Sequence, residues 1–296
     1  MRALQFTGFG PPSVMDVADV PAPHAGPGEI RIAVRASGLS AGETLIRSGA
    51  LKIQIPLPYR TGFDAAGIVD EVGPGVNGVD IGDDVFGWVA MSRRGANADL
   101  AVLVAWAPRP AAWSWPEAGG AAGTVETGTR VLDRLALGEG ETVLINGASG
   151  GVGTVAVQLA IARGLNVIGT ASERNHDLLR SLGATPATYG PGLPDRVRGV
   201  DAVFDCAGGA LPDLIAIAGD PSRVVTIADL TAADHGVHLS SGLSDPLAAH
   251  ALPIAVGLAN EGRLRVPVEA AFALEDAPAA HTLSESRRAR GKIVFV

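Results

Sequence analysis

The second half of the chain alternates short apolar runs with longer apolar segments of helical length. The short runs predict strands at residues 143–146, 166–170, 202–204 and 224–227, and the longer segments predict helices at 151–163, 175–182 and roughly 210–218. Strands and helices that alternate in this way form a parallel sheet with helices on both faces. A further apolar stretch at 247–260 predicts a buried helix.

The first part of the chain has a different rhythm, with short strand patterns separated by Gly and Pro. Strands are predicted at 30–36, 67–73 and 83–89, an arrangement typical of a small barrel or sandwich. Strand patterns return at 264–268 and 292–296. We therefore predict a first domain at residues 1–115, a second at 116–250, and a C-terminal segment at 251–296 that rejoins the first.

A glycine-rich turn joins one predicted strand to one predicted helix. The run Asn146-Gly147-Ala148-Ser149-Gly150-Gly151-Val152-Gly153 has the pattern A-x-G-x-x-G in the strand–turn–helix context that a dinucleotide-binding loop requires. A helix N-terminus attracts a pyrophosphate through its N–H groups and its dipole; Gly150 lets the backbone approach the phosphate, and Gly153 lets the helix pack close to the strand. A packing turn without a ligand is the alternative.

Composition narrows the class of protein. The 296 residues suffice for two domains, and 47% hydrophobic against 18% charged residues predicts a large core. The net charge of -8 argues against a nucleic-acid partner. No apolar run reaches about 18 residues and no signal peptide is evident, so no membrane association is expected. The single cysteine, Cys206, excludes an internal disulfide and fits a cytoplasmic protein.

Together these patterns resemble the zinc-independent medium-chain dehydrogenases/reductases of the quinone oxidoreductase group, almost from end to end. The matching segments are Ile46-Arg47-Ser48-Gly49, Gly62-Phe63-Asp64-Ala65-Ala66-Gly67-Ile68-Val69, Val72-Gly73-Pro74-Gly75-Val76, Gly82-Asp83-Asp84-Val85, the glycine-rich turn, Glu261-Gly262-Arg263-Leu264, Ala280-His281 and Gly291-Lys292-Ile293-Val294. The resemblance implies an α/β fold with a doubly wound parallel Rossmann sheet, a GroES-like β-barrel catalytic domain, and an active site in the cleft between them.

The ligand set for a catalytic zinc is missing. Such a zinc needs three Cys, His or carboxylate ligands and one open position. By resemblance, zinc-dependent relatives carry a cysteine in the loop that matches Ser37 to Ser40, and a His-Glu pair in place of Phe63-Asp64. One cysteine is also too few for the relatives' structural zinc, so we predict no metal. Cys206 is interpreted as a small packing residue near the cofactor rather than as a nucleophile.

Without a metal, positioned donors must stabilise the charge that develops on a conjugated oxygen. By resemblance, Ser40 lies where relatives often have Asn, and Thr127 matches a threonine near the nicotinamide. Leu45 replaces an active-site tyrosine of some relatives, which leaves Tyr59 as a candidate hydroxyl. The catalytic candidates are Ser40, Thr127 and Tyr59. For Ser40 the alternative is a residue that forms a turn, and for Tyr59 an ordinary loop tyrosine.

The end of the second Rossmann strand indicates NADPH rather than NADH. NAD-binding proteins place an acidic residue there, whereas Ser172 and Arg174 can donate to a phosphate, with Glu173 expected to point outward. Tyr189 resembles a family tyrosine beside the adenosine phosphate, and Lys292 has the alternative role of closing the barrel. The predicted cofactor contacts are Ala148, Ser149, Gly150, Gly151, Val152, Ser172, Arg174, Tyr189, Ala207, Ile227, Ala228 and Lys292.

Two functions remain open at this stage. The first is an NADPH-dependent reductase that transfers hydride to small-molecule quinones or conjugated enones and enoyl groups. The second is a cofactor-binding protein with little catalysis, like the crystallin and sensor-like members of the family. Leu45 and Ser40 allow this second function, because they stand where relatives have a tyrosine and an asparagine. By resemblance, a homodimer is expected through the edge strand Gly236-Val237-His238-Leu239-Ser240-Ser241.

Overall fold

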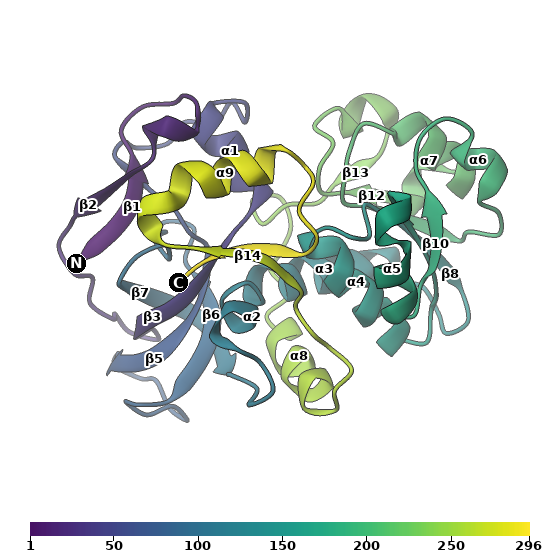
Figure 1. Ribbon diagram of the computed structural model, residues 1–296. Coiled ribbons are helices and arrows are strands. Elements are labelled where there is room, and N and C mark those ends of the chain that lie inside the picture. The colour runs from purple at the N-terminus through teal and green to yellow at the C-terminus, as the bar shows by residue number, and fades with distance from the viewer. The chain divides into compact units, whose positions relative to one another are not determined.

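The chain forms two compact units in the computed structural model, which describes residues 1–296 (Figure 1). Unit 1 comprises Met1–Gly123 and Leu252–Val296, and unit 2 comprises Thr124–Ala251. The chain therefore leaves unit 1, builds unit 2 and returns. None of the helices combines the length and the apolar character needed to cross a membrane.

A closed ring of four antiparallel strands forms the centre of unit 1. β3 (Ile30–Leu39) pairs with both β5 (Asp64–Val72) and β7 (Leu100–Pro108), and β6 (Asp84–Val89) lies between β5 and β7. β15 (Lys292–Phe295) pairs with the far end of β3, and β14 (Val268–Phe272) is the outer strand. The small barrel expected for the first part of the chain is present.

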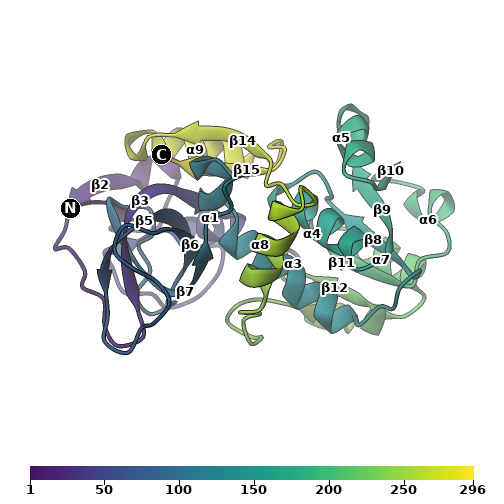
Figure 2. The ribbon, with the colours of Figure 1, turned by 90° about the horizontal axis from the view of Figure 1, so that it is seen from below.

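Apolar side chains from the two ends of the chain share one core in unit 1. Leu4 and Phe6 from the N-terminal part pack with Ile293 and Phe295 from the C-terminal part, and Figure 2 shows these segments side by side. The other elements of the unit are a three-stranded sheet, β1 (Arg2–Phe6), β2 (Asp16–Asp19) and β4 (Tyr59–Arg60), and the helices α1 (Ala41–Ser48), α2 (Trp115–Gly119), α8 (Ala251–Asn260) and α9 (Ala277–Glu285).

Unit 2 is built on a six-stranded sheet in which every pair of neighbours is parallel. Its order is β10-β9-β8-β11-β12-β13, the 3-2-1-4-5-6 order of a doubly wound nucleotide-binding sheet. The strands are β8 (Thr142–Asn146), β9 (Asn166–Ala171), β10 (Thr185–Thr188), β11 (Ala202–Asp205), β12 (Val224–Thr226) and β13 (His238–Leu239). The helices are α3 (Ala122–Leu135), α4 (Gly151–Ala162), α5 (His176–Ser181), α6 (Leu193–Arg196) and α7 (Leu211–Ala218). The predicted Rossmann architecture is confirmed.

Two predicted elements near the C-terminus are displaced. Residues 263–267 form no strand, and β14 begins only at Val268. Leu264 and Val266 are fully buried there, and the Leu264 carbonyl accepts a hydrogen bond from the Trp113 indole. The alternating apolar residues therefore reflect burial of an extended segment rather than sheet pairing. The helix expected at 247–260 begins at Ala251, after a turn.

Candidate functional site

The glycine-rich turn lies at the carboxyl end of β8 and leads directly into α4. Gly147 has a φ of 77°, and two hydrogen bonds fix the turn to β9: Gly147 N donates to Thr170 Oγ1 (3.0 Å) and Ala148 N donates to Thr170 O (2.9 Å). A Cβ on Gly153 would lie 2.3 Å from the Gly147 carbonyl oxygen. The close helix–strand packing predicted for Gly153 is therefore present, and any side chain there would break it.

The N-terminus of α4 is left open for an anion. Gly150 is the N-cap residue, and no side chain accepts from the first N–H groups of the helix. A Cβ on Gly150 would meet only the Gly147 oxygen, at 3.4 Å, so the space before the helix is accessible to a ligand. The first N–H groups of a helix have no intrahelical partner and carry the positive end of the dipole. Residues Ser149 to Val152 therefore fit the pyrophosphate of a dinucleotide.

The segment after β9 is tied to this loop. Asn175 is buried in the 3-10 turn Glu173–Asn175, and its Nδ2 donates to Ser149 Oγ (3.1 Å). Ser172 precedes the turn and is half-buried, whereas Glu173 and Arg174 are exposed. The candidate phosphate-binding residues thus lie on a segment that the nucleotide loop itself anchors. Tyr189, after β10, is 57% exposed.

A buried carboxylate organises the carboxyl ends of three neighbouring strands. Asp205 Oδ1 accepts from Asn146 Nδ2 (2.8 Å) and Ala207 N (3.0 Å), and Oδ2 accepts from Thr226 Oγ1 (2.7 Å). The predicted contacts Ala207, Ile227 and Ala228 follow β11 and β12 and are half-buried. Burial, and then the Asp205 charge, raise the pKa of the neighbouring Cys206 thiol, which keeps it protonated and supports its interpretation as a packing residue.

Ser40 lies at the N-terminus of α1 in unit 1. Its side chain accepts from Glu43 N (3.4 Å) while Glu43 Oε2 accepts from Ser40 N (2.9 Å), which is a reciprocal capping box. Ser40 therefore caps α1, whereas the alternative stated for it was a residue that forms a turn, and its catalytic role stays a prediction. Because its oxygen is used as an acceptor, the hydroxyl proton is still available to a substrate.

Glu43 is a residue that the sequence analysis missed. It is 1% exposed, and its Oε1 accepts from Gly62 N (2.6 Å) and from Asn97 Nδ2 (3.3 Å). One carboxylate thus fixes the start of α1, the turn before β5 and the segment before β7. Burial raises the pKa of Glu43 to about 7. The S-x-x-E spacing of Ser40 and Glu43 is the sequence signal that could have identified the cap, but not its long-range contacts.

Thr127 lies on α3, in unit 2, and is half-buried. Its Oγ1 donates to Glu126 Oε2 (3.3 Å), and the same carboxylate pairs with Arg130 Nε through Oε1 (2.8 Å). Arg130 in turn donates to Ser240 Oγ, after β13. The hydroxyl of Thr127 is thus held by its own helix.

Known proteins similar to this chain were found by sequence and by structure. The family described as "Alcohol dehydrogenase GroES-like domain" matches residues 26–122, and the family described as "Zinc-binding dehydrogenase" matches residues 192–295. A quinone oxidoreductase of Mus musculus is 32% identical over 95% of this chain and 93% of its own length. The chain belongs to the quinone oxidoreductase family.

Solved structures of the quinone oxidoreductase family agree with this assignment over the whole chain. The quinone oxidoreductase from Coxiella burnetii has a TM-score of 0.86 and 31% identity, covering 100% of this chain and 98% of its own. The Escherichia coli quinone oxidoreductase complexed with NADPH has a TM-score of 0.83 and 26% identity, covering all of both chains. This chain is therefore an oxidoreductase with a GroES-like domain and a Rossmann domain that binds a nicotinamide cofactor.

The name of one matched family implies zinc, but the residues of this quinone oxidoreductase relative do not fit that metal. No group of three or more His, Cys, Asp and Glu side chains is placed to hold a metal ion. Phe63 packs against the core of unit 1, and Cys206 lies in unit 2 at the end of a Rossmann strand.

Tyr59 and Lys292 are both buried within unit 1. Tyr59 is 3% exposed and stacks on Phe6, with ring centroids 5.0 Å apart, and its hydroxyl has no hydrogen-bond partner. Lys292 is 6% exposed, and its Nζ donates to Leu39 O (3.2 Å) inside the barrel sheet. The contact of Lys292 fits its alternative role in closing the barrel.

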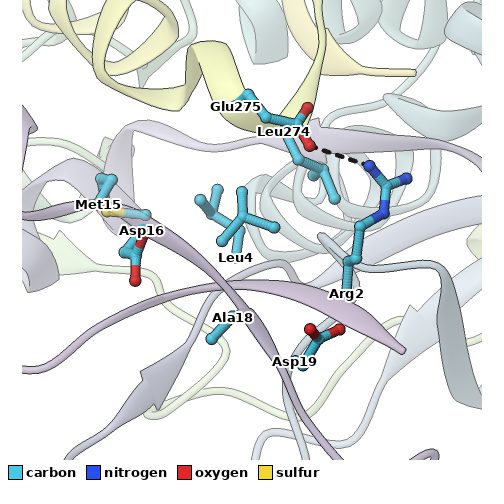
Figure 3. Close-up of a pocket in the computed structure, with 9 residues that line it drawn as sticks. Arg2, Leu4, Met15, Asp16, Ala18, Asp19, Leu274 and Glu275 are labelled. Carbon is cyan, nitrogen blue, oxygen red and sulfur yellow. Dashed lines mark hydrogen bonds and ion pairs between the residues drawn. The ribbon is translucent and has the colours of Figure 1, made fainter.

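The hollow in Figure 3 lies elsewhere in unit 1. It has a volume of about 420 Å³ and none of the predicted site residues lines it. Arg2, on its rim, is turned towards Glu275, to which Nη1 donates (2.9 Å), and Nη2 pairs with Asp99 (3.0 Å). The positive charge there is already neutralised, so this hollow does not offer a free cation to a ligand.

Two buried groups give unit 1 opposite responses to pH. His281, on α9, is fully buried without a partner for either ring nitrogen, and burial and then Arg47 lower its pKa to about 4. Its contribution to stability is present above pH 6.5 and is lost as the pH falls towards 4. Glu43, with its raised pKa, contributes stability below pH 4.5 that is lost as the pH rises towards 7. Between pH 4.5 and 6.5 the two contributions to the unfolding free energy change in opposite directions with pH and cancel.

We expect single variants at Glu43 and His281 to show each pH dependence of the unfolding free energy separately. Relative to wild type, Glu43→Gln should lose unfolding free energy as the pH falls from 6.5 to 4.5, on the order of 1 kcal/mol per pH unit. His281→Leu should show the opposite slope. Urea unfolding at three pH values measures both. Parallel pH profiles for wild type and both variants would contradict the assignment.

Proposed function

We propose that this chain is a zinc-independent, NADPH-dependent reductase of quinones or of conjugated enones and enoyl groups. The observation that carries the proposal is the donor at Ser40: a neutral hydroxyl, fixed in a capping box, whose proton is free. A simple ketone would place a localised negative charge on one oxygen, which relatives stabilise with zinc. A conjugated acceptor spreads that charge, so that a neutral donor suffices.

In this proposal, residues of unit 2 bind the cofactor and residues of unit 1 bind the substrate oxygen. When bound, the nicotinamide supplies the hydride. In unit 2, Ser149 to Val152 bind the pyrophosphate at the open N-terminus of α4, and Ser172 and Arg174 bind the adenosine phosphate. In unit 1, the Ser40 hydroxyl donates a hydrogen bond to the substrate oxygen on which charge grows, while Glu43 holds Ser40 in place. Thr127 is a second candidate donor and has to turn away from Glu126 to act.

A substrate panel tests this function. NADPH absorbance is followed with a naphthoquinone, a linear enone and a simple ketone, before and after dialysis against a chelator. We expect turnover of the quinone and the enone, unchanged by the chelator, and none of the ketone. Turnover confined to simple ketones, or loss of turnover on chelation, would overturn the proposal. No turnover with intact NADPH binding would favour the cofactor-binding protein, which the engaged Thr127 hydroxyl allows.

The preference for NADPH over NADH can be tested at Arg174. Arg174→Ala should weaken NADPH binding roughly tenfold to a hundredfold, since a hydrogen bond to a charged group contributes about 1.5–3 kcal/mol. NADH binding should not change. Arg180, which is exposed on α5 and paired with Asp177, provides the control as Arg180→Ala. Titration of the intrinsic fluorescence measures all affinities. Equal NADPH affinity in the two variants would rule out a phosphate-binding role.

The expected homodimer rests on the end of the Rossmann sheet. β13 is the last strand of the sheet, is two residues long and pairs only with β12. Its outer edge is therefore able to pair with a second copy of the chain. Light scattering at micromolar concentration should give twice the chain mass of 30.0 kDa. A mass of one chain would contradict the dimer.

A further inference from the structure

Arg94 adopts an unusual backbone conformation between β6 and β7. Its φ is 50°, in the left-handed region that residues other than glycine rarely adopt. Its Nε donates to Met91 O (2.7 Å), so the side chain folds back over its own turn. Strained backbone of this kind costs about 1–3 kcal/mol and clusters at binding sites. The conformation points to a role for the Arg94 side chain.

The Arg94 guanidinium lies over two aromatic rings. Its central carbon is 4.5 Å from the centroid of Tyr59 and 5.8 Å from that of Phe63. Arg94 Nη1 and the Tyr59 hydroxyl are both shielded from solvent and have no hydrogen-bond partner. A buried donor without a partner costs about 1–3 kcal/mol. Two such donors around one ring indicate that an acceptor binds there.

No carboxylate of the protein supplies that acceptor. Glu43 is the acidic neighbour whose charge acts on Arg94, but its oxygens already accept from the backbone of Ser40 and Gly62 and from Asn97 Nδ2. Arg94 consequently forms no ion pair, whereas the adjacent Arg93 pairs with Glu29 (2.9 Å). Arg94 is only partly buried, whereas its Nη1 and the Tyr59 hydroxyl are shielded, so a ligand has to enter beside the exposed part of the Arg94 side chain.

We propose that Arg94 and Tyr59 bind an anionic oxygen of the acceptor substrate, a carboxylate or a sulfonate on an aromatic ring. The guanidinium pairs with the anion, the Tyr59 hydroxyl donates to it, and Phe63 contacts the ring that carries it. The inference rests on the proposed function in one respect, that the bound ring belongs to the molecule that is reduced. It predicts a preference for anionic over neutral acceptors.

Equilibrium binding tests the inference without turnover. Calorimetric titration of the NADPH-saturated protein with 2-naphthoate and with its neutral isostere 2-naphthamide should show roughly tenfold tighter binding of naphthoate, as expected for one charge-assisted contact. Arg94→Met should abolish the difference, and Arg93→Met, the adjacent control, should retain it. Tyr59→Phe, which removes only the hydroxyl oxygen, should weaken naphthoate binding and leave naphthamide binding unchanged.

Three results would overturn the inference. The first is equal binding of naphthoate and naphthamide, and the second is equal effects of the Arg93 and Arg94 variants. The third is binding of inorganic phosphate as tight as that of naphthoate, which would make Arg94 a site for free inorganic anions. The substrate panel keeps the two proposals apart. Turnover without discrimination between the naphthalenes refutes only the anion site. Discrimination without any turnover refutes only the proposed reductase.

Discussion

Ser40→Ala is expected to slow hydride transfer about 10²–10³-fold while NADPH binding survives, because a donor that faces developing charge contributes that much to the rate. Apart from Lys292, the predicted cofactor-binding residues lie in unit 2, whereas Ser40 belongs to the capping box of α1 in unit 1. Single-turnover reduction of a quinone, followed at the NADPH absorbance, measures the step. A parallel fluorescence titration measures NADPH affinity.

Ser114→Ala is the matched control. Ser114 caps α2 with the same box, in which its Oγ accepts from Glu117 N and the Glu117 side chain accepts from Ser114 N. Both variants lose a helix cap and should lose about 1 kcal/mol of unfolding free energy. Only Ser40→Ala should lose the rate. Equal rates in the two variants would reduce Ser40 to a capping residue and remove it from the mechanism.

Gly153→Ala should weaken NADPH binding at least tenfold. The new Cβ would lie 2.3 Å from Gly147 O and 2.7 Å from Ala148 Cα, and backbone atoms cannot give way as a flexible side chain can. We expect α4 to move away from β8, with a loss of about 1–3 kcal/mol in stability. The N–H groups of the helix then no longer face the pyrophosphate, and affinity should fall tenfold or more, which corresponds to about 1.4 kcal/mol.

Gly257→Ala, in α8, is the control for this change. Apart from the backbone of its own helix, no atom lies within 4 Å of a Cβ at this position, and alanine favours a helix over glycine by about 0.5–1 kcal/mol. This variant should be slightly more stable and bind NADPH as wild type does. Thermal unfolding and cofactor titration measure both. Wild-type NADPH affinity in Gly153→Ala would contradict the role of the turn.

Local patterns predicted the parts of the molecule that depend on short-range contacts. The strand–turn–helix around Gly147 and the strands β8, β9, β11 and β12 follow from apolar periodicity and glycine spacing, and they are present, whereas β10 was not predicted. The strand predicted from the alternating apolar residues Leu264 and Val266 is wrong, because a buried extended segment has the same two-residue period as a strand. The domain boundaries at 115/116 and 250/251, and the roles of Ser40, Thr127 and Tyr59, stay predictions.

Long-range contacts account for what the sequence did not reveal. Glu43 accepts hydrogen bonds from Ser40, Gly62 and Asn97, which are separated by many residues. No local sequence pattern predicts that these three residues meet at one carboxylate. Arg94 likewise reaches Tyr59 and Phe63 from another part of the chain. Both depend on how the barrel brings its loops together, so only a three-dimensional structure could place them.

The return of the chain to unit 1 affects the order in which its parts can fold during synthesis on the ribosome. β15 lies between β14 and β3, and Ile293 and Phe295 complete the core around Leu4 and Phe6. The first 123 residues therefore emerge without the strand that closes their core, whereas unit 2 is one continuous segment. Although domains usually acquire structure in the order of their synthesis, here the nucleotide-binding unit can fold first. The core around Leu4 and Phe6 stays incomplete until Ile293 and Phe295 have been translated, whereas the barrel core around Ile32, Val69 and Leu103 lies wholly within the first 123 residues.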